Sequence, residues 1–123
     1  MDITNEKIFL MIITKDDIYN ITKENTKINY EKLTLILKEF LNSNNLKLED
    51  IQKIYVNRGP GSFAGIRNSL SIVKAINVAR NIDYYCYSLE DFKDQKDVKY
   101  EDIPNLCDKF KIKKNLIKPI YLS

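Results

Sequence analysis

All three glycines of this 123-residue chain lie within seven residues, at Gly59, Gly61 and Gly65. Average glycine usage would give about nine in a chain of this length. One of the three prolines and two of the three arginines belong to the same segment, Arg58–Arg67. Backbone conformations that only glycine tolerates are therefore concentrated in a single turn, and this turn limits the folds open to the chain.

The residues on either side of this turn predict a strand before it and a helix after it. Ile51–Val56 is a β-branched and aromatic run, which is typical of a strand. From Phe63 to Arg80, apolar residues recur at helical spacing, and Ser62 stands where a helix N-cap is expected. We therefore expect Gly59 and Gly61 to adopt backbone angles or close contacts that a side chain would forbid.

A glycine-rich turn before a helix has two possible uses. Its free amides, at the positive end of the helix dipole, can hold an anion such as a phosphate. Alternatively, the glycines only let the helix pack closely against the sheet. The spacing matches neither the P-loop nor the dinucleotide-binding fingerprint, which favours the structural use.

The rest of the chain predicts a small α/β fold. Residues 7–22 form an expected antiparallel hairpin with a turn at Lys15–Asp17. A helix is expected from Asn29 or Tyr30 to about Ser43. The strand expected at 82–87 should run parallel to the one at 51–57, because a full helix connects the two. The order strand-strand-helix-strand-helix-strand predicts a mixed sheet.

The chain changes character after Phe92. Residues 93–102 are charged and without periodicity, which predicts a solvated connection, and a short helix is expected over 103–110. Four lysines lie between Lys109 and Lys114, and a solvated surface is favoured there over an RNA contact. We therefore divide the chain into a domain of residues 1–92 and a short connection with a terminal motif, residues 93–123.

The composition excludes several kinds of chemistry. Because the chain has no histidine, it can hold neither a His-ligated zinc nor a Ser-His or Cys-His nucleophile pair. Cys86 and Cys107 lie outside any CxxC spacing and are expected as reduced thiols. No signal peptide and no membrane-spanning run is visible, which predicts a cytoplasmic protein without a membrane partner.

The segment Gly59–Arg67, with the sequence GPGSFAGIR, resembles the GPGSFTGLR signature of the TsaB family. This family is the bacterial subunit for biosynthesis of tRNA threonylcarbamoyladenosine. Four further segments are similar in register. Asp2–Thr4 resembles the family's Asp-Thr-Ser, and Asn29–Leu33 its His-Ser-Glu-Arg-Leu-like helix start; Ser88–Glu90 resembles its SSLE segment, and Pro119–Ser123 its closing P-x-Y-L-R. The residues of the family motif turn are Gly59, Pro60, Gly61, Ser62, Phe63, Gly65 and Arg67.

The resemblance implies the N-terminal half of an actin-like, or RNase H-like, domain. Members of the family are much longer, so most of their C-terminal half has no counterpart here. The strand that precedes the Asp-Thr-Ser segment in the family is also missing, because this segment begins at Asp2.

The resemblance also implies a partner subunit without an active site of its own. In the family, the TsaB-like subunit binds and activates a TsaD-like transferase through two helices, and a TsaE-like ATPase docks on the pair. The tRNA meets the subunit only through the complex. The two helices correspond to residues 30–43 and 64–80 here. No catalytic residue, cofactor or metal is implied.

The apolar pattern of the second helix agrees with such an interface. Two adjacent apolar lines form an arc wider than one core face needs, although a helix enclosed in its own domain would show the same arc. The residues expected at the partner surface are Leu35, Ile66, Leu70, Val73 and Asn77. Whether Leu70 or Ile76 faces outward stays open, and the same surface would serve a homodimer of the isolated chain.

Two other functions stay open at this point. A nucleotide-binding transferase could use the glycine-rich turn, with Asp2 as the carboxylate for Mg²⁺. A structural homodimer could pair the same two helices across a twofold axis. A glycoprotease, an older label for this group of proteins, is disfavoured because the chain lacks histidine ligands for a metal.

Overall fold

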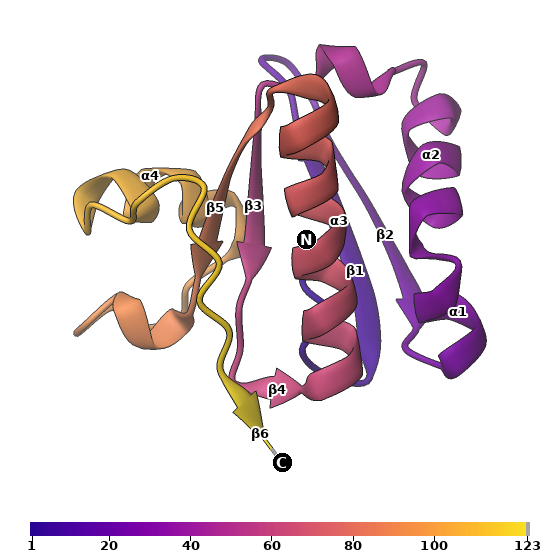
Figure 1. Cartoon of the computed structure of the whole chain (residues 1–123). Helices are drawn as coiled ribbons and strands as arrows, with labels where there is room; N and C mark the ends of the chain where they lie inside the picture. The colour runs from indigo at the N-terminus through magenta and orange to yellow at the C-terminus, as the bar shows by residue number, and fades with distance from the viewer. Residues whose placement is uncertain (123) are drawn as a thin grey trace.

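The computed structural model describes residues 1–122 of the chain (Figure 1). The expected terminal motif extends to Ser123, which lies outside the described residues. The strands are β1 (Lys7–Ile13), β2 (Ile18–Glu24), β3 (Lys53–Asn57), β4 (Gly61–Ser62), β5 (Asp83–Tyr87) and β6 (Tyr121–Leu122). The helices are α1 (Lys27–Glu31), α2 (Leu33–Ser43), α3 (Phe63–Arg80) and α4 (Ile103–Lys109), with short 3-10 turns η1 (Leu48–Asp50), η2 (Leu89–Asp91) and η3 (Tyr100–Asp102).

The strands form three two-stranded sheets. β1 and β2 pair antiparallel as the expected hairpin. β3 and β5 pair parallel, also as expected, and helix α3 connects them. β4 and β6 make a third, parallel pair. The prediction of a single mixed sheet is wrong, because no strand of the described chain lies between β1 and β3.

The first two residues join β1 to β3. The amide of Asp2 donates to the carbonyl of Phe9 at 2.9 Å and the amide of Phe9 donates back to Asp2 at 2.9 Å. The amino group of Met1 donates to the carbonyl of Tyr55 at 2.9 Å, and the amide of Asn57 donates to the carbonyl of Met1 at 2.9 Å. At this point β1 and β3 therefore lie two strand spacings apart, with the chain start between them.

Helices cover both faces of the β3–β5 pair, and α2 covers one face of β1. In Figure 1, α2 and α3 lie side by side, and α4 lies on the other side of β5. α2 packs on β1 through Ile8, Leu10, Ile12, Leu33, Ile36, Phe40 and Leu41. α3 packs on β3 and β5 through Val56, Ile66, Leu70, Val73, Tyr84 and Cys86. α4 packs on the opposite face of β5 through Tyr87, Phe92, Ile103, Leu106 and Cys107.

The local sequence explains how α3 begins and ends. The hydroxyl of Ser62 accepts from the amide of Gly65 at 3.4 Å, so the expected N-cap is confirmed. Asn81 ends the helix in the left-handed conformation, φ 57°, which asparagine tolerates better than most residues. The expected helix at 29–43 differs: it begins earlier, at Lys27, and is interrupted at Lys32, so that α1 and α2 are separate.

The segment after Phe92 is packed rather than solvated at one important position. The ring of Tyr100 in η3 stacks on Phe9 of β1 with 4.1 Å between ring centroids. Its hydroxyl donates to Oδ2 of Asp2 at 2.8 Å. The prediction of a wholly solvated connection is therefore wrong, because an aromatic residue inside a charged run can anchor the whole run. The expected short helix is present as α4.

No helix among residues 1–122 is both long enough and apolar enough to cross a bilayer.

Candidate functional site

The glycine-rich turn is built around close contacts between backbones. A Cβ on Gly59 would collide with the carbonyl oxygen of Ile120, and φ of Gly59 is +116°, where side chains are strained. A Cβ on Gly61 would collide with the backbone of Thr4. A Cβ on Gly65 would collide with the carbonyl oxygen of Ile3. The turn thus holds both ends of the chain, and the expectation that Gly59 and Gly61 tolerate no side chain is confirmed.

Several amides of the turn donate to protein oxygens. The amide of Gly59 donates to Oδ1 of Asn57 at 2.9 Å, and the amide of Ser62 donates to the carbonyl of Thr4 at 3.0 Å. The amide of Gly65 is used by the Ser62 cap. Because these donors are already bonded within the chain, the geometry fits the structural use of the turn rather than a phosphate site.

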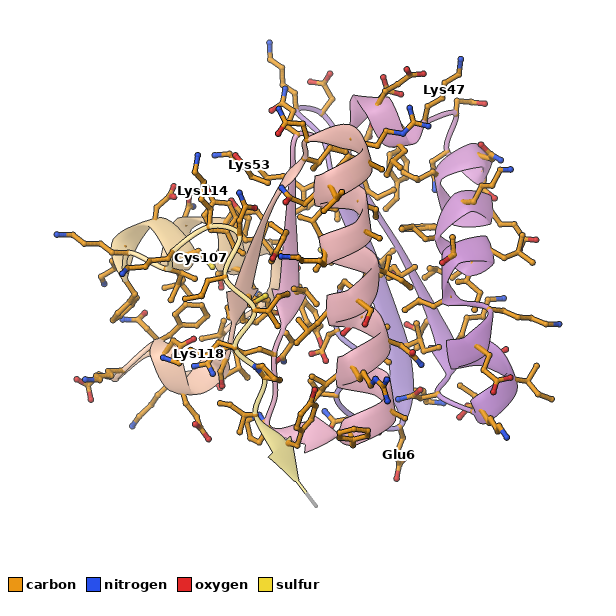
Figure 2. All side chains as sticks on the ribbon, in the orientation of Figure 1. Glu6, Lys47, Lys53, Cys107, Lys114 and Lys118 are labelled. Carbon is orange, nitrogen blue, oxygen red and sulfur yellow. The ribbon has the colours of Figure 1, made fainter. Side chains whose placement is uncertain are left out.

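A largely buried ion pair fixes the segment that follows α4. Nη2 of Arg58 lies 2.6 Å from Oδ1 of Asp91, and Nε donates to Oδ2 at 3.3 Å. Nη1 of Arg58 also donates to the carbonyl of Lys118 at 3.1 Å, and the amide of Ile120 donates to the carbonyl of Arg58 at 2.8 Å. Figure 2 shows Lys118 on the chain that passes beside β5. Sequence reasoning missed Asp91, although it follows directly after the recognised Ser88–Glu90 segment.

Asp2 is the centre of a polar cluster beside the carboxyl end of β3. Its Oδ1 accepts from the amide of Thr4 at 3.1 Å and from the hydroxyl of Thr4 at 2.7 Å. Its Oδ2 accepts from Nδ2 of Asn57 at 3.1 Å and from the hydroxyl of Tyr100 at 2.8 Å. Four donors thus satisfy a carboxylate that is only 8% exposed. This environment suits a structural carboxylate better than a Mg²⁺ ligand, which needs free oxygens.

The space next to Asp2 is small. A cavity of about 150 Å³ lies between Asp2, Asn57 and η3. Pockets for small-molecule ligands usually enclose about 300–1,000 Å³. No group of three or more Cys, Asp or Glu side chains within residues 1–122 is placed to hold a metal ion. The cluster is therefore suited to tie β3, η3 and the chain start together.

The two cysteines are poor nucleophiles. Both are buried and unpaired in the described part of the chain. Burial raises the pKa of the Cys86 thiol to about 11 and that of the Cys107 thiol to about 12. Since only the thiolate attacks, neither thiol is suited to covalent catalysis at neutral pH.

The structure corrects the expected partner surface. Ile66, Leu70 and Val73 lie in the core against β3 and β5, so the prediction that they face a partner is wrong. The physical reason is that α3 uses its most continuous apolar line to cover the parallel strands. Leu35 on α2 is exposed, as expected. Asn77 is half-buried, and its amide donates to the carbonyl of Ile82 at 3.1 Å.

The outward face of α3 carries other residues. It presents Arg67, Ser71, Lys74, Ala75 and Val78, and Val78 is 76% exposed. At the start of the helix, Phe63 packs on Tyr121 with 4.7 Å between ring centroids, and the Arg67 guanidinium lies 5.9 Å from the centre of the Phe63 ring. The residues of the family motif turn therefore lie together, with Phe63 and Arg67 at the surface.

Comparison with known proteins decides the family. The sequence model described as TsaD, tRNA N6-adenosine threonylcarbamoyltransferase, matches residues 24–88, more than half of the chain. The chain belongs to this family. A curated relative is the tRNA threonylcarbamoyladenosine biosynthesis protein TsaB of Buchnera aphidicola subsp. Baizongia pistaciae (strain Bp), with 31% identity over 75 residues, 61% of this chain. The resemblance to TsaB is thereby confirmed.

Solved structures of TsaB-like proteins share the fold. YeaZ from Pseudomonas aeruginosa superposes with a TM-score of 0.65 at 18% identity over 71% of this chain. An uncharacterized protein with similarity to peptidase YeaZ, from the same organism, gives the same TM-score. This likeness shows a mixed α/β fold like that of YeaZ. The chain spans 34% of the length of the Buchnera TsaB and 41% and 40% of the two structures.

Proposed function

We propose that this chain is a non-catalytic subunit in the biosynthesis of tRNA threonylcarbamoyladenosine, and that it acts in the cytoplasm. It binds and activates a TsaD-like transferase through the outward faces of α2 and α3. A TsaE-like ATPase joins through that pair, and tRNA meets the chain only within the complex. Membership of the TsaD family and similarity to TsaB support this role.

The observation that carries the proposal is the exposed apolar surface of the helical layer. Large apolar side chains project from each of its three helices: Ile28 of α1, Leu35 of α2, and Phe63 and Val78 of α3. Leaving apolar area in water costs about 25 cal/mol per Å². Exposed apolar side chains on three helices that contact one another favour a protein interaction surface.

The polar sites of the chain support a role without catalysis. The carboxylate of Asp2 is held by four donors, the amides of the glycine-rich turn bond to the chain itself, and both thiols are protonated. A calorimetric titration with ATP and Mg²⁺ is expected to give no micromolar binding. Micromolar binding would favour the nucleotide-dependent transferase instead.

The association itself is tested by the solution mass of the chain with and without the organism's TsaD-like protein. We expect a 1:1 complex that Val78→Glu and Leu35→Glu disrupt. The matched control is Leu116→Glu, since Leu116 is exposed but lies on the coil after α4 rather than on the helical layer. A complex that survives both helix variants, or no complex at all, would contradict the proposal.

The same experiment separates the homodimer from the heterodimer. In isolation, the chain is expected to pair with itself through this surface, because one apolar surface can serve both associations. If the TsaD-like protein fails to displace the second copy, the structural homodimer becomes the better description.

A further inference from the structure

The charges of the chain are divided unevenly along the sequence. Two stretches, residues 51–82 and 109–123, contain ten of the twenty basic residues and none of the seventeen acidic ones. These stretches therefore carry a charge of +10, whereas the rest of the chain, with ten basic and seventeen acidic residues, carries −7. Residues 83–108 separate the two stretches in the sequence. Whether their charges act together thus depends on the fold.

The fold brings the two acid-free stretches side by side. β4 pairs with β6, and Nη1 of Arg58 donates to the carbonyl of Lys118 at 3.1 Å. Further along, the side-chain amide of Asn77 on α3 donates to Oδ1 of Asn115 at 3.3 Å. In Figure 1 the coil after α4 passes beside β5 and reaches β6 next to the start of α3. The positive charges of both stretches therefore lie in one region of the molecule.

Most of these basic side chains are exposed and make no ion pair within residues 1–122. Arg58 is buried and pairs with Asp91, and Nζ of Lys114 lies 3.6 Å from Oδ2 of Asp83. Figure 2 shows Lys114 near Lys53, at the end where β3 and β5 begin. The other eight, which we call the basic surface, are Lys53, Arg67, Lys74, Arg80, Lys109, Lys111, Lys113 and Lys118.

A surface of uniform charge is unfavourable for the chain by itself. Like charges that folding brings together repel each other. Elsewhere in this chain, lysines alternate with carboxylates, as where Lys7 of β1 pairs with Glu24 of β2. A partner of opposite charge removes the repulsion, and it gains free energy through the release of its own counterions. The basic surface therefore suits a polyanion.

The shape of the basic surface favours a nucleic acid backbone. Its basic side chains stand on the exposed side of a helix and on an exposed coil. Arg67 and Arg80 lie thirteen residues apart on α3, which is about 20 Å along the helix axis. An extended line of charges matches the repeated phosphates of a nucleic acid strand better than one small anion.

A membrane surface fits these observations less well. A helix that lies on an anionic membrane inserts its apolar face between the lipids. The apolar face of α3 is buried against β3 and β5, where Ile66, Leu70 and Val73 pack. The helix thus offers charge to a partner but no continuous apolar face to insert.

We propose that the basic surface binds the phosphate backbone of RNA. This step rests on the proposed function, in which the RNA is the tRNA bound by the complex with the TsaD-like transferase. Lys74 precedes Val78 of the expected partner surface by one helical turn, so the RNA would lie beside the transferase. Phosphate contacts carry no sequence information, so the chain adds affinity for tRNA and leaves recognition of the base to its partner.

The experiment measures tRNA binding to the complex of the chain with the organism's TsaD-like protein at several salt concentrations. The variant carries Lys113→Gln and Lys118→Gln, two exposed positions on the coil rather than on the helical layer. We expect the affinity for an unmodified tRNA transcript to fall by about fivefold or more at about 0.1 M salt. The plot of log affinity against log salt should become shallower by about 1–2, because each lost phosphate contact removes about 0.7–0.9 from its slope.

A matched control removes the same charge elsewhere. It carries Lys15→Gln and Lys23→Gln, two exposed lysines of the hairpin, and should leave affinity and slope unchanged. An equal loss in the control would assign the effect to net charge and overturn the basic surface. A loss of affinity in the coil variant without a change of slope would show a structural effect, and would also contradict the proposal.

The solution mass distinguishes failure of this inference from failure of the proposed function. The coil variant is expected to form the 1:1 complex like the unchanged chain. If the unchanged chain forms no complex, the proposed function fails, and the same variants are compared in the isolated chain at about 50 mM salt, where phosphate contacts are strongest. Weaker tRNA binding by the coil variant than by the hairpin control then supports the basic surface, and equal or absent binding overturns it.

Vesicles that contain phosphatidylserine test the other polyanion. At the same salt, the unchanged chain is expected to bind tRNA more tightly than these vesicles. Tighter binding to the vesicles, lost in the coil variant, would assign the surface to an anionic membrane and overturn the assignment to RNA.

Discussion

At the scale of single residues, the glycines show which contacts could be predicted from the sequence and which could not. Their concentration in one segment predicted a turn with close contacts, and the structure confirms it at Gly59 and Gly61. The sequence did not disclose the partners of those contacts. These are Ile3 and Thr4 at one end of the chain and Ile120 at the other. Contacts over such separations leave no local pattern, because periodicity and propensity act over a few residues.

We expect Gly65→Ala to destabilise the chain by about 1–3 kcal/mol through overpacking. Alanine favours a helix over glycine by about 1 kcal/mol, so helix propensity alone predicts the opposite sign. The collision with the Ile3 carbonyl outweighs this gain, because neither backbone can move without breaking the turn. Urea unfolding measures the difference.

Ser71→Ala is the matched control, since Ser71 lies on the exposed face of the same helix. Its effect should be neutral or slightly stabilising. A Gly65→Ala protein as stable as the Ser71→Ala protein would show that the chain start is loosely held.

The second prediction at this scale concerns pH. Burial lowers the pKa of the Met1 amino group from 8.0 to about 6. Between these values the unfolded chain binds more protons than the folded one, so stability rises with pH, by about 2–3 kcal/mol. This gain is complete above pH 8 and is lost as the pH falls to 6. Because the chain has no histidine, other groups contribute little in this window.

Urea unfolding at intervals from about pH 5.5 to 8.5 measures this rise. The Nα-acetylated chain is the control, because it cannot titrate at this position and should give a nearly flat profile. An equal rise in the acetylated chain would assign the effect to another group.

At the scale of elements, most of the fold could be predicted from sequence. The spacing of apolar residues and the capping residues predicted the positions of most elements correctly. These are the hairpin, the strands β3 and β5, helix α3 with its Ser62 cap, and helix α4. The outward face of α3 could not be predicted, because the helix carries apolar residues on two flanks. Only the packing of Leu70 on the parallel strands shows which flank is buried.

We therefore expect Leu70→Glu to unfold the chain rather than only abolish association. Leu70 is 3% exposed, and an unpaired carboxylate at this position has no partner to offset its desolvation. Circular dichroism and urea unfolding should show a loss of most of the stability. Val78→Glu, on the exposed face of the same helix, is the matched control and should unfold like the unchanged chain. A Leu70→Glu chain that is folded and monomeric would show that this residue faces outward, and would contradict the prediction.

At the scale of the whole molecule, the chain consists of two halves, because β1 and β3 belong to different sheets. One half is β1, β2, α1 and α2, and the other is β3, β5, α3 and α4. They meet through residues 1–4, through the contacts of α1 and α2 with α3, and through the stacking of Tyr100 on Phe9. Composition and periodicity could not show this division, because each half has ordinary elements and the division depends on which strands pair.

This arrangement predicts unequal stability within the molecule. The ladder of β3 and β5 is covered by α3 on one face and α4 on the other, whereas β2 is largely exposed. Opening β1 and β2 therefore exposes less apolar surface and needs less free energy. In native-state hydrogen exchange, we expect the amide of Ile21, opposite Leu10, to exchange at least about tenfold faster than the amide of Val56, opposite Cys86. Equal rates would mean that the halves open together, and that the contacts between them couple them as tightly as a continuous sheet would.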